Sequence, residues 1–377
     1  MNKLPYRNVL VKRIIKSYVI PCLWIFAIAI PIAGITKAVF AAMLLFIALL
    51  IFNLFIRNRS PLKRTEHRRS TEAVSLYITR YGWMLVFTSS VIIPLFLNNY
   101  AIDVVTSALF YTMLALGLNL LVGDLGLLNL GYIAFYGIGA YTYAILYSKF
   151  GFGFWSSVGL GGLTSAAISL LIAIPTLKLQ GDYLAIVTLG FGEIVRITLN
   201  NWDSLTNGPN GIMGIPRPSF PGLKFLSGIS FYYLALLFVI VQIYIISRLG
   251  RSRFGRYAVA IRENEQASEM VGIDTYKIKI LYFMLSAFFG GIAGVLFASK
   301  QMFVSPDSFT FIESVYVLAM VILGGMGNIA GVIAGAFTLV VLPELLRGFV
   351  VYRMLIFALL LITMMLFRPE GLFGKSR

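Results

Sequence analysis

A few polar side chains interrupt otherwise apolar stretches, and they are the residues whose types could do chemistry in this sequence. Asn119 lies inside one apolar run and Asn129 near the start of the next, on either side of a sharp connection at residues 123–126. Glu193 and Arg196 are three residues apart, so on a helix they share a face and can neutralise each other. An amide or carboxyl group in hydrocarbon needs a partner or water. These side chains therefore either line a polar route for a small zwitterion or amide, or serve structurally as a helix cap and a packing ion pair.

Other kinds of chemistry lack the residues they need. The single cysteine and single histidine, Cys22 and His67, exclude an intrachain disulfide and argue against a Cys/His metal site or a His-based catalytic triad. Residues 374–376, Gly-Lys-Ser, copy the end of a phosphate-binding loop, but Pro369 stands where the leading glycine belongs and no helix follows. We therefore expect a chain that is not an enzyme and holds neither metal nor cofactor, so that any ATP is bound by another subunit.

The polar segment at residues 248–279 differs from the others because it mixes seven basic with four acidic residues. Its apolar residues recur at roughly helical spacing: Val259, Ala260, Ala267, Met270 and Val271. The pattern predicts a short amphipathic helix over residues 256–270 that ends at Gly272, since glycine commonly caps helix C-termini. A helix on a lipid surface would favour Lys and Arg, whereas this one carries Glu263, Glu265 and Glu269. We expect it to bind a protein partner; lying on the lipid surface is the alternative.

The composition indicates which elements position these residues. The chain is 59% hydrophobic and 12% charged, with a mean hydropathy of +0.87, whereas soluble proteins carry about 25% charged residues. At about 20 apolar residues per crossing, it is predicted to be an all-α polytopic membrane protein with about ten transmembrane helices. The apolar runs lie at residues 18–34, 39–56, 83–98, 104–122, 126–148, 153–175, 183–199, 229–247, 280–298 and 350–367.

The excess of basic residues, 31 Lys and Arg against 15 Asp and Glu, predicts the orientation of the chain rather than a nucleic-acid site. Placing both termini in the cytoplasm puts 23 of the 31 basic residues in cytoplasmic segments. These segments are residues 1–17, 57–80, 123–125, 176–182, 248–279 and 368–377. Residues 1–82 then form an N-terminal helical hairpin with a basic cytoplasmic loop, and residues 83–377 form the transmembrane domain.

Residues 314–342 are predicted to form two short helices joined by a bend at membrane depth, a broken re-entrant pair. The centre of the run, residues 323–328, has three glycines and an asparagine, and such a break is tolerated where protein or water covers it. The outer loop at residues 200–228 contains four prolines and is predicted to form turns. That loop is either a docking surface or a simple connector.

Glycines predict close packing of the helices. Most of the 35 glycines lie inside apolar runs, and the spacing of Gly290 with Gly294 recurs in Gly331 with Gly335. Small residues four apart let helix backbones approach closely in lipid. We therefore expect Gly-rich helix packing.

Several sequence strings follow one another in a specific order. They are GLNLLVG at 117–123, GLLNLG at 126–131, AFYGIGAY at 134–141, GDYLAIVTLG at 181–190, the loop at 253–272, LGGMGN at 323–328 and FRPEGLFG at 367–374. Together they resemble the LivM-type permease subunits of branched-chain amino acid ABC importers, over about residues 83–374.

The resemblance implies an assembly in a bacterial or archaeal inner membrane. A second, LivH-like permease would complete the path, two cytoplasmic ATPase subunits would bind ATP, and an extracytoplasmic binding protein would deliver leucine, isoleucine or valine. A short cytoplasmic helix of such importers docks on the ATPase, for which this chain offers Arg262, Glu263, Asn264, Glu265, Ala267 and Gly272. The candidates to line the path are Asn119, Asn129, Tyr141, Thr188 and Glu193.

The sequence departs from the family pattern at two places and leaves rival functions open. The Glu-Ala-Ala loop pattern is present only as Glu265-Gln266-Ala267, and residues 129–133 read NLGYI where many members have SLGHA. A urea or short-chain amide permease would share nearly every string. An ion-coupled secondary transporter would need intramembrane carboxylates, for which only Glu193 is a candidate. A membrane-embedded enzyme would need clustered acid-base groups.

Overall fold

The computed structural model describes residues 97–176, 181–220, 223–224 and 228–345, together with four isolated residues. The predicted hairpin at residues 1–82 and nearly all of the runs at 83–98 and 350–367 lie outside the described residues. The chain divides into two compact units, residues 1–97 with 342–359 and residues 98–341 with 360–377. Almost all described residues belong to the second unit.

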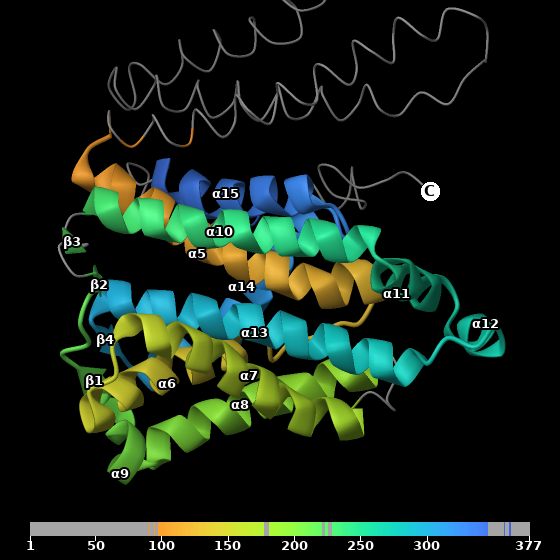
Figure 1. Cartoon of the computed structure of the whole chain (residues 1–377), viewed down its shortest axis with the longest axis horizontal. Helices are drawn as coiled ribbons and strands as arrows, with labels where there is room; N and C mark the ends of the chain where they lie inside the picture. Colours follow the sequence, from red (N-terminus) through yellow and green to blue (C-terminus); the bar gives the residue numbers. More distant parts are fainter. Residues whose placement is uncertain are drawn as a thin grey trace, which may run out of the picture. The chain divides into compact units, whose positions relative to one another are not determined.

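The described part of the second unit is a bundle of helices that lie side by side, with short strands and small helices at the ends (Figure 1). Its larger helices are α5 (Asn99–Asn119), α6 (Ile133–Phe150), α7 (Phe154–Thr176), α8 (Asp182–Asn201), α10 (Gly228–Arg251), α13 (Thr275–Gln301), α14 (Phe311–Gly324) and α15 (Ile329–Leu345). The π-helix η4 (Leu120–Leu125) continues α5, and α11 (Arg253–Glu263) and α12 (Glu265–Met270) form the loop between α10 and α13.

Short elements complete the opposite end of the bundle. They are α9 (Asp203–Thr206), the 3₁₀ turns η5 (Gly208–Asn210) and η6 (Pro306–Ser308), and the strands β1 (Ile212–Met213), β2 (Ser219–Phe220), β3 (Leu223–Lys224) and β4 (Phe303–Val304). β1 pairs antiparallel with β4, with Ile212 opposite Val304, and β2 pairs antiparallel with β3. The prediction of turns is confirmed for residues 202–220, which hold only a short helix, a 3₁₀ turn and two-residue strands, and the β1–β4 pair ties this loop to the end of α13.

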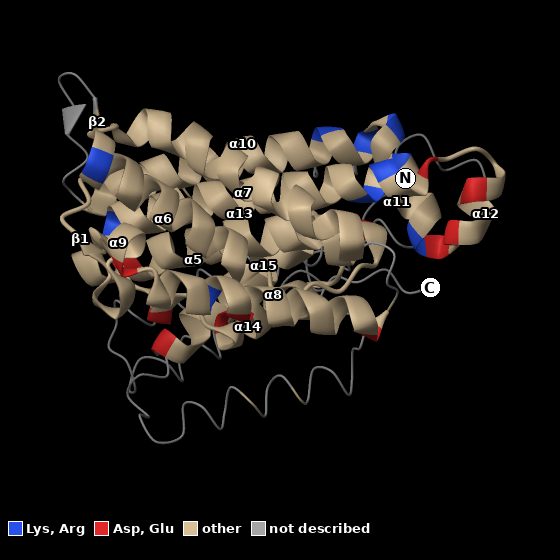
Figure 2. Cartoon of the chain, turned by 90° about the horizontal axis from the view of Figure 1, so that it is seen from below, with Lys and Arg blue, Asp and Glu red and all other residues tan. Residues whose placement is uncertain are grey.

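The protein is a multi-pass membrane protein. Five segments of the described residues are long and apolar enough to cross a bilayer: Asn99–Leu125, Phe154–Thr176, Gly228–Arg251, Thr275–Gln301 and Pro306–Gly324. Most Lys, Arg, Asp and Glu residues of the described helices lie near the two ends of the bundle, as Figure 2 shows. This distribution keeps most of the charges away from the hydrocarbon.

Five helices match predicted apolar runs closely. They are α5 with η4 (run 104–122), α7 (153–175), α8 (183–199), α10 (229–247) and α13 (280–298). The prediction is wrong for residues 126–132. They form an irregular segment, and the helix begins only at Ile133. The physical reason is that Gly126 adopts a left-handed conformation with φ 73° and ends the preceding helix.

The predicted break in residues 314–342 is confirmed, since α14 and α15 are separate helices on either side of Gly325–Asn328. The two helices run antiparallel. A Cβ placed on Gly324 would lie 2.4 Å from the carbonyl oxygen of Gly331, and one placed on Gly335 would lie 2.4 Å from that of Met320. Farther from the bend, the hydroxyl of Tyr316 donates a hydrogen bond to the carbonyl of Leu339. Residues 311–341 therefore form a tight hairpin with glycine at its closest contacts.

The core of the bundle is the packing of α13 against α6 and α7, where glycine backbones touch. A Cβ on Gly139 of α6 would lie 2.1 Å from the carbonyl oxygen of Gly291 in α13. One on Gly291 would lie 2.4 Å from the carbonyl oxygen of Gly161 in α7, and one on Gly294 would lie 2.1 Å from that of Tyr136. The predicted Gly-rich packing is confirmed here, because any side chain at these positions would force the helices apart.

Candidate functional site

The irregular segment 126–132 leads from the exposed Gly126 to the buried residues 131–132, and its buried backbone polar groups need protein partners. The N–H of Leu130 donates to Oγ1 of Thr188 (3.1 Å), and that of Gly131 donates to Oδ1 of Asn129 (2.9 Å). The N–H of Ile133, at the start of α6, donates to Oγ of Ser314 (3.1 Å). Side chains from α8 and α14 thus hold the connection between η4 and α6.

Asn119 holds a second irregular segment, the bend of the α14–α15 hairpin. Its Oδ1 accepts a hydrogen bond of 2.9 Å from the N–H of Gly327. Gly123, one turn farther along, must be glycine, because a Cβ there would lie 2.2 Å from Oδ1 of Asn119 and 2.5 Å from the nitrogen of Gly327. The bend therefore lies against the end of the α5–η4 helix, at the end of the bundle that carries α11.

Four of the five predicted path residues are buried within this chain. Asn119, Asn129, Tyr141 and Thr188 are each at most 2% exposed. The segment 126–132 brings Asn129 and Thr188 together, whereas Asn119 lies at the hairpin bend. Among the described residues, Nδ2 of Asn129 and the hydroxyl of Tyr141 have no hydrogen-bond partner. Only Glu193 of the five lies at the surface of the described bundle.

Glu193 belongs to a largely uncovered face of α8. Its carboxylate accepts a hydrogen bond of 2.9 Å from Nε of Arg196, and both side chains are about one-third exposed (32% and 30%). The predicted ion pair is confirmed. Large apolar side chains around it are exposed at helical spacing: Tyr183, Ile186, Val187, Ile194 and Ile197. The buried side of α8 is narrow and consists of Leu184, Ala185 and Thr188.

The loop at residues 248–279 contains two helices, so the prediction of one continuous helix over residues 256–270 is wrong. Asn264 has an extended backbone (φ −159°, ψ 107°) and separates α11 from α12. Its side chain explains the break, because Oδ1 accepts a hydrogen bond of 3.0 Å from the N–H of Ala267 and caps the start of α12. The predicted end at Gly272 is confirmed: this residue has φ 86°, and the N–H groups of Gly272 and Ile273 bond back to the carbonyls of Glu269 and Ser268.

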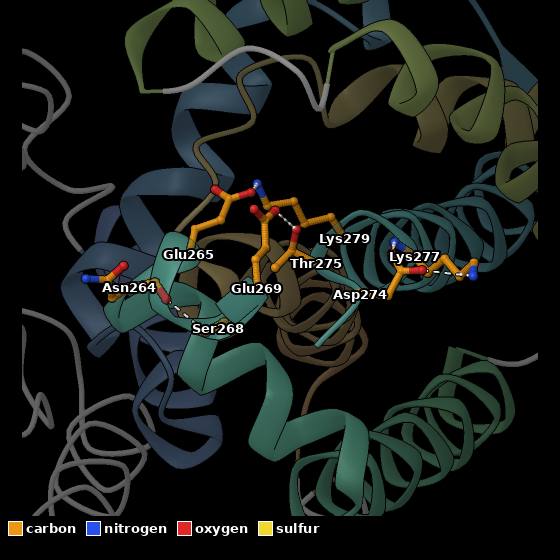
Figure 3. A network of polar contacts seen from close by, with 8 residues as sticks. All are labelled: Asn264, Glu265, Ser268, Glu269, Asp274, Thr275, Lys277 and Lys279. Carbon is orange, nitrogen blue, oxygen red and sulfur yellow. Dashed lines mark hydrogen bonds and ion pairs between the residues drawn. The ribbon is translucent and has the colours of Figure 1, made fainter. Parts of the chain in front are cut away.

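Polar contacts fasten α12 to the start of α13 (Figure 3). The carboxylate of Glu265 forms an ion pair with the ammonium group of Lys279, whose side chain is only 4% exposed. The hydroxyl of Thr275 donates a hydrogen bond of 2.6 Å to the carboxylate of Glu269. Asp274 caps α13 through the N–H of Lys277 (3.1 Å), and the hydrogen bond from the Lys277 side chain holds the pKa of this carboxyl below its usual range. These contacts give α12 a defined position on α13.

The exposed surface around α12 is apolar and acidic, whereas the first turn of α11 exposes Arg253 and Arg256. Met270 is 87% and Val271 is 76% exposed, and Val259 on α11 is also exposed. Glu263 and Glu269 are exposed between them. Arg262 points the other way, since its guanidinium donates a hydrogen bond to the carbonyl of Gly123.

Comparisons of the sequence with known proteins assign the chain to a family. Residues 100–366 match the family described as "Branched-chain amino acid transport system / permease component". The chain belongs to this family. It is 45% identical to the "High-affinity branched-chain amino acid transport system permease protein LivM" of Salmonella typhimurium, over 78% of this chain and 75% of the relative. The protein of the same description from Escherichia coli K12 is 46% identical, over 75% of this chain and 72% of the relative.

A more distant relative is the "Probable branched-chain amino acid transport permease protein LivM" of Methanocaldococcus jannaschii, which is 27% identical over 58% of this chain and 67% of the relative. No solved structure gives a significant match. The chain is thus a permease component of a multi-subunit transport system, not an enzyme. The family match does not extend over residues 1–99.

Three residues of this permease component that organise the irregular segments were not among the predicted site residues. Ser314 caps α6, Gly327 binds Asn119, and Lys279 pairs with Glu265. Lys279 carried a signal in the sequence, because it is a lysine at the edge of a predicted span. Ser314 and Gly327 act through long-range contacts that the spacing of residues along the chain does not indicate.

Proposed function

We propose that this permease component forms one half of the transmembrane path of an ABC importer for leucine, isoleucine and valine. The observation that carries the proposal is the loop between α10 and α13, which is folded, fastened to α13 and exposes apolar side chains on its outer surface. The names of the relatives support the class of solute. In this proposal ATP is bound and hydrolysed by two separate cytoplasmic ATPase subunits.

The loop is the docking surface for an ATPase subunit. Met270 and Val271 project from the end of α12, with Glu263 and Glu269 nearby. A helix that lies on an anionic membrane surface would present Lys and Arg instead of these acids. The side chains of Met270 and Val271 fit an apolar groove, and the acids fit a basic rim. Of the predicted coupling residues, Glu263 and Ala267 are exposed for such a contact, whereas Asn264, Glu265 and Gly272 shape the loop.

The uncovered face of α8 lines the gap between this chain and a second, homologous permease. The contact surface consists of Tyr183, Ile186, Ile194 and Ile197. The Glu193–Arg196 pair supplies a polar patch, where the carboxylate of Glu193 can bind the ammonium group of a zwitterion and the guanidinium of Arg196 its carboxylate. A pair of opposite charges imposes no net charge on the path. Solute would reach it from an extracytoplasmic binding protein docked near residues 202–220.

We infer the orientation from the charges. The loop end of the bundle carries basic residues at positions 248, 251, 253 and 256, so it is cytoplasmic, as are both chain termini. About ten helices cross the membrane. The α14–α15 hairpin enters and leaves from the outer side, and because its bend lies beside Gly123 and Arg262, it reaches the loop end of the bundle.

The test is replacement of the docking surface in the assembled importer. Met270→Ser with Val271→Ser removes the exposed apolar side chains and leaves the capping residues and the Glu265–Lys279 ion pair in place. We expect ATP-driven leucine uptake in proteoliposomes to fall at least tenfold, together with weaker binding of the ATPase to the permease pair. The matched control is Ile312→Ser, an exposed apolar residue at the start of α14. Uptake and ATPase binding at the wild-type level in the double variant would refute the docking surface.

A further inference from the structure

Three segments that are far apart in the sequence meet at the loop end of the bundle. They are the end of η4 around Gly123, the hairpin bend at residues 325–328, and the last turn of α11 with Arg262. The guanidinium of Arg262 donates to the carbonyl of Gly123. The same nitrogen lies 3.4 Å from where a Cβ of Gly327 would be. Arg262 therefore touches two segments that Asn119 already joins through its bond to Gly327.

The contact has a specific chemical basis. The carbonyl of Gly123 lies in the last turn of the α5–η4 helix, where carbonyl groups have no partner within the helix. The dipole of the helix makes this end negative, which favours a cation. Arg262 supplies both the donor and the charge, and it also interacts electrostatically with Asp124. The guanidinium thus caps a membrane helix from a cytoplasmic element.

The three segments are packed too closely to move independently. A Cβ on Gly123 would lie 2.5 Å from the nitrogen of Gly327, and one on Gly126 would lie 3.2 Å from Cγ of Arg262. Two glycines thus let the bend and the arginine stem approach the helix end. A displacement of Arg262 is transmitted directly to the end of η4 and to the bend.

The loop has a second, separate attachment. Glu265 and Glu269 of α12 bind Lys279 and Thr275 of α13 (Figure 3), on the other side of the extended residue Asn264. A movement of α12 therefore reaches α13 through these contacts, and reaches α5 and the hairpin through α11 and Arg262. Because Ser314 near the start of α14 binds the start of α6, a shift of the hairpin also reaches the segment that contacts α8.

We infer that Arg262 is a positioning residue that couples the cytoplasmic loop to the end of α5–η4 and to the bend of the α14–α15 hairpin. ATP-driven movement of the loop then displaces both together. The inference rests on the proposed docking of an ATPase on this loop. Arg262 acts through the elements it positions and touches neither ATP nor solute.

The experiment uses the complete importer in proteoliposomes, with leucine as the solute and ATP supplied on the side of the ATPase subunits. Cys22→Ser removes the native cysteine, so that spin labels react only with introduced cysteines. The first readout is the ratio of leucine transported to ATP hydrolysed. We expect Arg262→Gln to lower this ratio at least tenfold while ATP hydrolysis continues, because the loop still moves but the hairpin does not follow. Arg262→Lys keeps the charge but loses the planar guanidinium, so its ratio should fall between those of the wild type and Arg262→Gln. Arg256→Gln, an exposed arginine on the same helix, is the matched control and should keep the wild-type ratio.

The second readout is the distance between spin labels at Met326→Cys in the bend and Gln266→Cys in α12, before and after trapping with ATP and vanadate. With Arg262 present, the distance should stay constant because the two sites move together. In Arg262→Gln it should shift or broaden on trapping. A wild-type transport ratio together with an unchanged distance in Arg262→Gln would overturn the inference.

The two proposals fail in different ways. If the label at residue 266 keeps its mobility when the ATPase is added, the docking surface is wrong, whatever Arg262 does. If that label responds and Arg262→Gln behaves as the wild type, only the role of Arg262 is wrong. Should Arg262→Gln reduce assembly, Arg262→Lys decides: a ratio at least twofold lower supports the coupling role, and a wild-type ratio with an unchanged distance contradicts it.

Discussion

Glycine and asparagine residues at particular positions determine how this bundle is assembled. Gly139, Gly291 and Gly161 place the backbones of three helices in direct contact. Asn119 and Asn129 accept hydrogen bonds from backbone N–H groups outside regular helices. In hydrocarbon an unsatisfied N–H is costly, so an amide side chain that accepts it stabilises the irregular segment.

Replacing Gly139 by alanine tests the glycine contact. The added Cβ would lie 2.1 Å from the carbonyl oxygen of Gly291 and 2.5 Å from its Cα, and backbone atoms cannot move aside as a flexible side chain can. Overpacking of this kind typically costs about 1–3 kcal/mol, so we expect a lower melting temperature in detergent. Gly159→Ala in α7 is the control, because no atom lies within 4 Å of its added Cβ. Equal melting temperatures for the two variants would contradict the packing described for α6 and α13.

At the scale of elements, polar contacts between distant segments occur where helices are interrupted. Four interruptions separate elements that would otherwise be continuous helices. They are the π-helix η4, the irregular segment 126–132, the bend 325–328 and the extended Asn264. Thr188 and Ser314 hold segment 126–132, and Asn119 holds the bend, whereas Asn264 caps α12 with its own side chain. The breaks are therefore defined positions in the fold at which neighbouring helices are linked.

The attachment of α12 to α13 can be measured through the Glu265–Lys279 pair. Glu265→Gln removes the charge that accompanies the Lys279 ammonium, which is nearly fully buried (4% exposed). Because the side chain of Glu265 is 30% exposed and partly screened by water, we expect a loss of about 1–3 kcal/mol, less than for a fully buried pair.

The double variant Glu265→Gln with Lys279→Met should recover part of this loss, since no buried charge is then left unpaired. Thermal unfolding of the purified permease measures Glu265→Gln, Lys279→Met and the double variant, and Lys277→Gln, in an exposed pair, is the control. Strictly additive effects of the two substitutions would show that the pair does not hold α12 to α13.

At the scale of the described bundle, most charged residues lie near its two ends, and the middle is mostly apolar (Figure 2). The loop end carries the docking surface and Arg262, whereas the opposite end carries the β1–β4 pair and the turns of residues 202–220. The described residues contain no cluster of three or more metal-ligating side chains. As a permease component, the chain is expected to receive the energy for transport from partner subunits.

Transport by the assembled importer should depend on ATP and not on an ion gradient. Glu193 is paired with Arg196, which makes it a poor site for a coupling proton or sodium ion. We expect leucine uptake to persist when ionophores collapse the gradients and to stop when ATP is withheld. The permease chain alone, reconstituted without ATPases, should not accumulate leucine. Uptake that survives without ATP but is lost with the gradient would identify a secondary transporter instead.

The sequence by itself determined the class of protein, the positions of most described helices, the broken hairpin and the amphipathic loop. These features depend on local composition and spacing: apolar runs of sufficient length, glycines at the bend, and a cap at Gly272. The family could also be recognised from ordered strings. Local signals were enough because each feature depends mainly on the residues within one segment.

Only the tertiary structure decided which groups the polar residues bind. It showed that Asn119 accepts a hydrogen bond from the bend 208 positions away and that the guanidinium of Arg262 donates to the carbonyl of Gly123. The start of α6 at Ile133 depends on a hydrogen bond to Ser314 of another helix. The break at Asn264 depends on the cap that its side chain forms at the start of α12. A hydrogen bond between distant segments depends on how the helices pack, and spacing along the chain does not specify that packing.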